Sequence, residues 1–148
     1  EAARKLAAMS PNFVIKLGAS EDAYRAVREL AGEGIRTNLT LVFSISQAWH
    51  AARSGAAFVS PFVGWKEQHG DDGLDLITDI ATMLAMHSYS TEIIAAAIRN
   101  PRQIGHAAVA GAHCVTAGMA VYRDSFRSPY TDMGHEIFGR AWDATPPD

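Results

Sequence analysis

Five short, strongly apolar segments alternate with helix-like segments, and this alternation limits the possible folds more than any other feature. The predicted strands are residues 12–17, 36–43, 57–63, 91–98 and 113–117. Helices are predicted at residues 2–9, 20–34, 44–55, 74–88, 100–111, 119–126 and 132–143, and a polar loop at 64–73. Such strands are typical of a parallel sheet covered by helices. The sequence therefore predicts an α/β fold of about five βα units, in a single domain over residues 1–148.

Two architectures fit this pattern. Five βα units would make the later part of a TIM (β/α)8 barrel, a fold that usually needs about 250 residues. A five-stranded doubly wound sheet is the alternative, and the length of 148 residues fits it better. Residues 1–10 have the composition of the end of a helix, and the first residue is Glu1. We therefore expect the chain to be the later part of a longer protein.

Composition and charge argue against several classes of partner. A net charge of −3 without a basic block argues against nucleic acid, and no apolar run is long enough to span a membrane. The single cysteine, Cys114, lies in an apolar stretch, where we expect a buried thiol. It can form no internal disulfide, which favours a cytoplasmic location. The six histidines lack metal-ligand spacing, so we expect no metal.

One lysine stands out because of its surroundings. Lys16 lies in the middle of the apolar segment "NFVIKLGAS", whereas Lys5 and Lys66, the other two lysines, lie among polar residues. Burial of an unpaired ammonium group is costly and lowers its pKa. An amine with a lowered pKa is the nucleophile that Schiff-base chemistry requires. The structural alternative is a lysine at a sheet edge that extends its amine to solvent.

Period-two alternation assigns the strand residues to two faces. Leu39, Leu41 and Phe43 are expected to face the helices, with Val42 on the opposite face. In residues 91–98, Ile94, Ala96 and Ile98 are expected on one face, and Ile93, Ala95 and Ala97 on the opposite face together with Arg99. The polar residues Lys16, Asn38, Thr40, Ser60 and Arg99 fall on the second face or at its carboxyl end. In a barrel these groups converge at the top, where barrel enzymes place their active sites, and should hydrogen-bond to one another.

Several of these segments together resemble one enzyme family. The segments "FVIK", "EGIRTNLTLVFS", "AFVSPFVG", "TEIIAAAIR" and "SPYTDMGHEIFGRAWD" are similar to the small-subunit transaldolases, a family that includes the fructose-6-phosphate aldolases. The resemblance implies a class I aldolase-type barrel without its first three βα units, and thus without the carboxylates that the family carries on its first and third strands. It also implies a homo-oligomer in which the C-terminal helix clasps neighbouring subunits.

The resemblance also implies roles for individual residues. Lys16 matches the lysine that forms an imine with a ketose, so no separate cofactor is expected. Asn38 matches an asparagine that contacts the bound dihydroxyacetone unit, and Ser60 a serine that contacts the substrate. Thr40 matches the threonine that helps to hold the catalytic water. Phe62 matches a phenylalanine of transaldolases that is tyrosine in the aldolases, which favours transfer over simple cleavage.

The match departs from the family pattern at the phosphate site. Trp65 stands where the family has an arginine, and Ala97 where it has a serine; only Arg99 remains. Gly18 and Ser20 stand where the family has proline and threonine after the lysine. Tryptophan offers none of the paired donors with which arginine holds phosphate.

Three hypotheses follow from these observations. The first is transaldolase-type transfer between sugar phosphates through Lys16. The second is a related aldolase or transferase for a less phosphorylated sugar, against which Trp65 stacks. The third is a truncated, inactive relative that keeps Lys16 by descent, which fold alone does not exclude.

Overall fold

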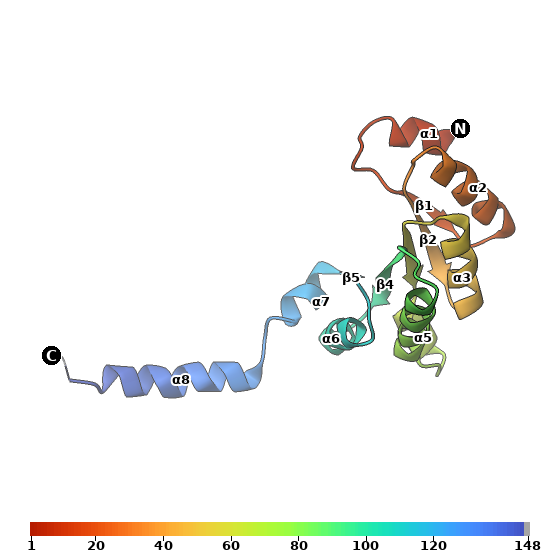
Figure 1. Ribbon diagram of the computed structural model, residues 1–148. Helices are drawn as coiled ribbons and strands as arrows, with labels where there is room; N and C mark the ends of the chain where they lie inside the picture. Colours follow the sequence, from red (N-terminus) through yellow and green to blue (C-terminus); the bar gives the residue numbers. More distant parts are fainter. Residues whose placement is uncertain (147–148) are drawn as a thin grey trace.

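A computed structural model describes residues 1–146 as five strands and eight helices. The strands are β1 (Ile15–Gly18), β2 (Thr37–Val42), β3 (Phe58–Pro61), β4 (Glu92–Ile98) and β5 (Cys114–Ala117). The helices are α1 (Ala2–Ala7), α2 (Glu21–Gly32), α3 (Ile45–Ser54), α4 (Val63–Gln68), α5 (Gly73–Met86), α6 (Pro101–Val109), α7 (Met119–Asp124) and α8 (Pro129–Asp143). The order of the elements is shown in Figure 1.

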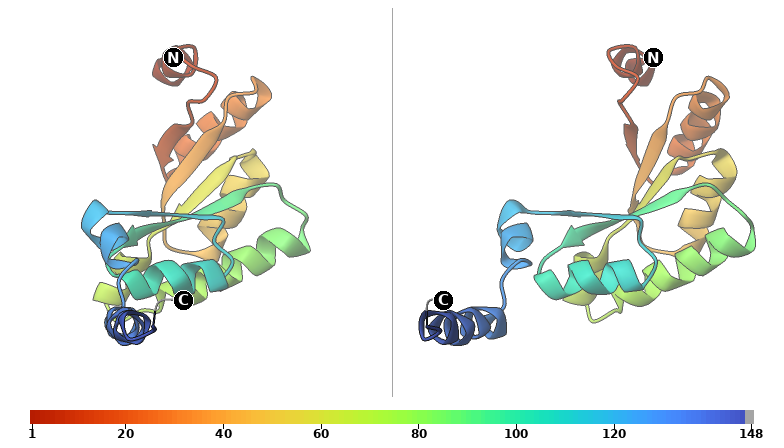
Figure 2. Two further views of the ribbon diagram at one scale, coloured as in Figure 1. Left: turned by 90° about the vertical axis from the view of Figure 1, so that its left-hand side faces the viewer. Right: turned by 60° about the vertical axis from the view of Figure 1, so that its left-hand side comes forward.

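The strand order separates the two architectures that the strand–helix pattern left open, and it agrees with the barrel that the resemblance implied. All five strands are parallel and lie in chain order, β1-β2-β3-β4-β5. Right-handed crossovers that always step in one direction place their helices on one face, and α2, α3, α5 and α6 pack side by side there (Figures 1 and 2). A doubly wound sheet would reverse its strand order and carry helices on both faces. The fold is therefore part of a (β/α)8 barrel.

The core lies between the sheet and these helices. Val27 of α2, Leu39 of β2, Val59 of β3 and Ile77 of α5 are fully buried in one cluster. Each such side chain contributes about 1.5–3 kcal/mol through burial. The opposite face of the sheet, which carries Lys16, is covered by none of these helices in residues 1–146, and Lys16 is exposed. The burial expected for Lys16 is therefore not found in this chain.

Side-chain caps fix where the helices that follow the strands begin. Ser20 accepts a hydrogen bond from the Ala23 N–H at the start of α2. Ser44 and Gln47 form a capping box at α3, in which each side chain bonds the other residue's backbone. Asn100 caps α6 in the same way as Ser20. Because each cap follows its strand closely, it also fixes the direction in which the chain leaves the carboxyl end of the sheet.

Two sequence-based expectations about local structure were wrong. The polar loop expected at 64–73 begins as helix α4, because Val63 and Gly64 are buried at its start. Cys114 is exposed, since β5 lies at the edge of the sheet. Helix α8 extends away from the sheet, and its Trp142 is 81% exposed (Figure 1). No helix within residues 1–146 is long and apolar enough to cross a membrane.

Candidate active site

The uncovered face of the sheet carries a short row of polar residues on neighbouring strands. The register pairs Lys16 of β1 with Asn38 of β2, and Thr40 of β2 with Ser60 of β3. The Ser60 hydroxyl donates a 2.9 Å hydrogen bond to Asn38 Oδ1, and both side chains are buried, with 1% and 8% exposure. The sequence-based expectation that these polar groups bond to one another is therefore confirmed for this pair. The bond fixes the Asn38 amide beside Lys16, with its nitrogen left to donate elsewhere.

Thr40 has a buried hydroxyl beside this pair. Within residues 1–146, its Oγ1 has no hydrogen-bond partner, and the same holds for Oγ1 of Thr37. A buried hydroxyl without a partner is costly, and native structures usually supply one from protein, water or ligand. A water or another polar group would supply the partner that Thr40 Oγ1 lacks among the described residues.

The strands that supply Phe43 and Arg99 both end in a backbone irregularity. Leu41 and Ala97 have φ values of 59° and 57°, in the left-handed region that residues with a Cβ seldom adopt. The pairing register shifts at both places, between Thr40 and Val42 and between Ala95 and Ile98. Such shifts are β-bulges, which redirect side chains and are common beside active sites.

The bulges overturn part of the predicted alternation. Val42, expected on the polar face, joins the hydrophobic core, and so do Ile93 and Ala95, which were expected on the same face as Arg99; Leu41, expected in the core, is 39% exposed. Phe43 consequently leaves the helix-facing side predicted for it and contacts Phe62. Neither Leu41 nor Ala97 is a glycine, so these bulges could not be predicted from the residue types.

Three aromatic side chains meet at the carboxyl end of β2 and β3. The ring of Trp65 stacks on Phe43, with centroids 6.0 Å apart, and meets Phe62 edge-on at 5.2 Å. Phe43 and Phe62 contact each other edge-on at 5.7 Å. Trp65 nevertheless keeps 44% of its surface exposed. The cluster holds the indole in place and leaves a face available to a ligand.

Four of the seven predicted site residues line one pocket of about 420 Å³: Lys16, Phe62, Trp65 and Arg99. The rest of its lining comes from the end of β4 and from residues 116–118, including Thr116 and Gly118. Asn38, Thr40 and Ser60 do not line this pocket, but they occupy β2 and β3 next to it. Thr116 was missed by the sequence reasoning, because β5 is too short for its alternation to assign a face.

The charges in this pocket come from Lys16 and Arg99. Lys5 pairs with Glu1 at 3.0 Å and Lys66 with Asp71 at 3.1 Å, so Lys16 is the one lysine without an ion pair among the described residues. The pocket thus presents an arginine and a lysine that has no ion pair among the described residues, two cationic side chains that suit a ligand with an anionic end.

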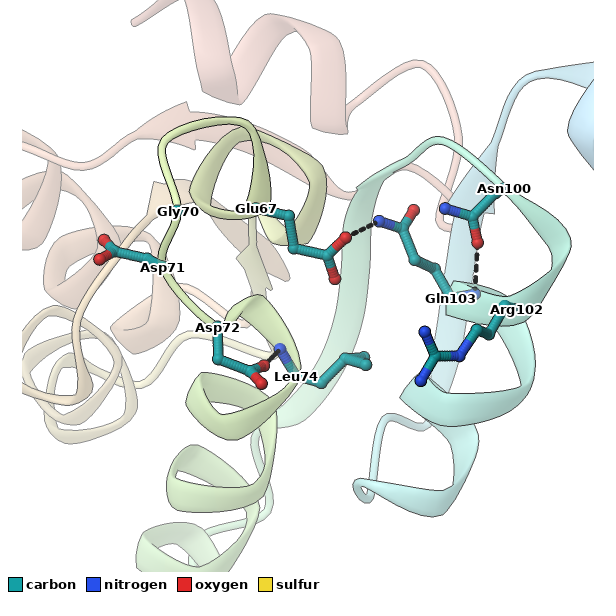
Figure 3. A pocket seen from close by; sticks show the side chains of 8 residues that line it. All are labelled: Glu67, Gly70, Asp71, Asp72, Leu74, Asn100, Arg102 and Gln103. Carbon is teal, nitrogen blue, oxygen red and sulfur yellow. Dashed lines mark hydrogen bonds between the residues drawn. The ribbon is translucent and has the colours of Figure 1, made fainter.

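A second pocket of about 370 Å³ lies between the α4–α5 connection and the start of α6 (Figure 3). It contains none of the seven predicted site residues. Asp72, in its lining, caps α5 by accepting bonds from the N–H groups of Asp75 and Leu74, which lower the pKa of the Asp72 carboxyl. Glu67 and Gln103 hydrogen-bond to each other across it. In residues 1–146, no group of three or more metal-ligating side chains is gathered here or elsewhere.

Comparison with known proteins identifies the family. The family model described as transaldolase/fructose-6-phosphate aldolase matches residues 1–144. The chain belongs to this family. The resemblance noted in the sequence, from "FVIK" to "FGRAWD", is thereby confirmed, and so is the barrel-type fold.

Individual relatives place the chain within the family. It is 52% identical, over 98% of its length, to proteins named 6-deoxy-6-sulfo-D-fructose transaldolase from Priestia aryabhattai and Priestia megaterium. It is 46% identical, over 96% of its length, to a probable transaldolase from Caulobacter sp. (strain K31). These matches cover 64% and 65% of the relatives, so the chain spans less than two thirds of their length.

Proposed function

We propose that the protein containing this chain transfers a three-carbon ketose unit through an imine on Lys16. The observation that carries this proposal is the pocket that joins Lys16 to Arg99 at the carboxyl ends of parallel strands, in a chain of the transaldolase family. Active sites of βα barrels lie at this end of the strands. Residues that contact the bound unit would be Asn38 and Ser60, with Thr40 holding a water.

The reaction is balanced as follows. The Lys16 amine attacks the C2 carbonyl of the ketose, and loss of water leaves an iminium ion. As the C4 hydroxyl gives up its proton to a water, the C3–C4 bond breaks, the iminium accepts its electron pair, and the aldehyde half departs. The three-carbon enamine then attacks the carbonyl carbon of an acceptor aldehyde, whose oxygen takes a proton from the water, and hydrolysis of the new imine releases the product ketose and the lysine. Phe62 offers no hydroxyl to protonate the enamine, which favours transfer over cleavage.

For the donor, we propose a ketose with a sulfonate at C6. A phosphate monoester carries a charge of about −1.5 to −2 at pH 7 and offers several acceptor oxygens, whereas a sulfonate carries a single negative charge. Arg99 is the remaining cation of the anion site, because Trp65 and Ala97 replace the arginine and serine of the family pattern. The 52% identity to proteins named for a sulfonated fructose supports the same donor.

A comparison of donors tests this choice. We expect the full-length gene product to use 6-deoxy-6-sulfofructose with a kcat/KM at least about ten-fold above that for fructose 6-phosphate, a difference of about 1.4 kcal/mol in the transition state. The double substitution Trp65→Arg with Ala97→Ser should narrow or reverse this ratio, because it restores two phosphate donors. Equal use of both donors, or better use of the phosphate, would refute the choice of donor without refuting the transfer reaction.

We further propose that the protein is a homo-oligomer. The α8 side chains Tyr130, Phe138 and Trp142 are 81%, 74% and 81% exposed, an apolar surface that water-exposed helices seldom present. Light scattering of the full-length protein should give a mass of several subunits. A monodisperse monomer would contradict this proposal.

A further inference from the structure

Gln103 joins three segments next to the proposed anion site, although it lies outside the Lys16 pocket. Its side chain is buried, with 4% exposure, and both of its polar atoms are hydrogen-bonded. Its carbonyl oxygen accepts a 2.5 Å bond from the backbone N–H of Arg99, and its amide nitrogen donates a 2.5 Å bond to Glu67 Oε2. Its backbone N–H donates to Asn100 Oδ1 at 3.0 Å. Figure 3 shows Gln103 of α6 and Glu67 of α4 pointing toward each other.

A second contact joins α4 to the end of β4. A Cβ atom on Gly64 would lie 2.2 Å from the Ala97 carbonyl oxygen and 2.7 Å from Arg99 Cγ, so the α4 backbone rests directly on this strand end. Trp65 follows Gly64, and Glu67 is two residues further along the same helix. Helix α4 is therefore fixed to the Arg99 segment at its start by close packing and near its end by Gln103.

Gln47 occupies the equivalent position after β2, and a comparison of its hydrogen bonds with those of Gln103 shows which contact is particular to Gln103. Gln47 accepts bonds from the N–H groups of Phe43 and Ser44, at 2.7 and 3.1 Å. It stands six residues after Leu41, as Gln103 stands six after Ala97, and both Leu41 and Ala97 are left-handed. Within the described residues, however, only the Gln103 amide nitrogen bonds a side chain of another helix. Gln47 accepts hydrogen bonds from the backbone at the end of β2. Gln103 does the same at the end of β4 and also holds α4 through Glu67.

We propose that Gln103 is a positioning residue that sets the placement of Arg99 relative to Trp65 and thereby the affinity of the site for the anionic end of its ligand. This inference rests on the proposed function for the identity of that ligand, a sulfonate on a short polyol. Gln103 does not touch the ligand and acts through the Arg99 backbone and through Glu67. A displacement of about 1 Å in such a support can cost about a hundred-fold in activity.

The first test measures binding without catalysis. The probe is 2,3-dihydroxypropane-1-sulfonate, which has the C4–C6 end of the proposed donor and no carbonyl group. Its dissociation constant for the full-length protein is measured by calorimetry for the wild type, Gln103→Leu and the matched control Gln47→Leu. We expect Gln103→Leu to weaken binding by about ten-fold or more and Gln47→Leu by less than about two-fold. Equal weakening by both substitutions, no weakening, or a wild type that does not bind the probe would overturn the inference.

The second test exchanges the two hydrogen-bonding side chains, Gln103 and Glu67. It decides the question even if Gln103→Leu does not fold. Gln103→Glu places a carboxylate against Glu67 and should weaken binding of the probe. Adding Glu67→Gln restores the bond in the reverse direction: the new amide at position 67 donates to the new carboxylate at position 103. This carboxylate can still accept from the Arg99 N–H. The double variant should recover to within about three-fold of wild type, and a double variant no better than Gln103→Glu would overturn the inference.

Kinetics separates this inference from the proposed function. Gln103→Leu should raise KM for the sulfonated ketose about ten-fold, with kcat and imine formation from uncharged dihydroxyacetone changed less than about two-fold. An equal loss with both substrates would indicate a merely structural role and overturn the inference. If the wild type binds the probe but traps no imine, the proposed transfer fails and the positioning role stands.

Discussion

The contact between Gly64 and the end of β4 yields a prediction whose size follows from the structure. In Gly64→Ala, the added Cβ would lie 2.2 Å from the Ala97 carbonyl oxygen, a distance that must open beyond 3.0 Å. The neighbour is backbone, held by the β4 ladder and by the Gln103 bond to Arg99, so it cannot rotate away as a side chain would. Helix α4 must therefore shift and carry Trp65 away from Arg99.

Insertion of a methyl group into such packing costs about 1–3 kcal/mol. For a protein of this size, each kcal/mol lowers Tm by about 2–4 °C. Gly105→Ala is the matched control, because Gly105 lies within α6 and its Cβ would meet no atom within 4 Å. That substitution should be neutral or stabilising by up to about 1 kcal/mol, through helix propensity.

Urea unfolding of the full-length gene product, followed by circular dichroism, measures both variants. Gly64→Ala should lower the midpoint and Gly105→Ala should not. Binding of the sulfonate probe should weaken only in Gly64→Ala. The packing argument fails if Gly64→Ala is as stable as wild type, or if both substitutions destabilise the protein equally.

Two further predictions concern stability. Ser60→Ala should cost about 1–3 kcal/mol, because it leaves the buried Asn38 Oδ1 without its donor; a change below about 0.5 kcal/mol in urea unfolding would contradict the importance of this 2.9 Å bond. Asp72→Ala should cost about 1 kcal/mol at pH 7 through loss of the α5 cap. Since the folded-state pKa of Asp72 lies below its ordinary value of 3.8, its contribution is present above that pH and is lost as the pH falls through the folded-state pKa. The difference between wild type and Asp72→Ala should therefore shrink as the pH falls below the ordinary pKa of 3.8, and a difference that grows in acid would contradict this reasoning.

Much of the fold could be predicted from periodicity and helix caps. All five strands lie within or next to their predicted ranges; β2, for example, spans Thr37–Val42 within 36–43. The resemblance to the transaldolases implied the barrel, which is confirmed, but the strand–helix pattern alone could not decide between barrel and doubly wound sheet, since both folds consist of the same βα units. This choice depends on the direction in which each unit adds to the sheet, which is a property of the packed helices.

The site was predictable only in part, for a local reason. Alternation correctly placed Asn38 and Ser60 together, because both precede the bulges. It failed across Leu41 and Ala97, because one left-handed residue changes which residues on its two sides share a face: Phe43 leaves the helix-facing side, and Ile93 and Ala95 do not share the face of Arg99. The same bulges bring Phe43 to the aromatic cluster. The burial predicted for Lys16 failed because the polar face of the sheet is uncovered in this chain.

Trapping of the imine is the most direct test of the central claim. The full-length gene product is incubated with dihydroxyacetone or 6-deoxy-6-sulfofructose, reduced with borohydride and mapped by mass spectrometry, with Lys16→Met as the control. We expect one three-carbon adduct on Lys16 and none in Lys16→Met. Unmodified Lys16, or a comparable adduct on Lys5 or Lys66, would contradict the claim that this pocket performs transaldolase chemistry.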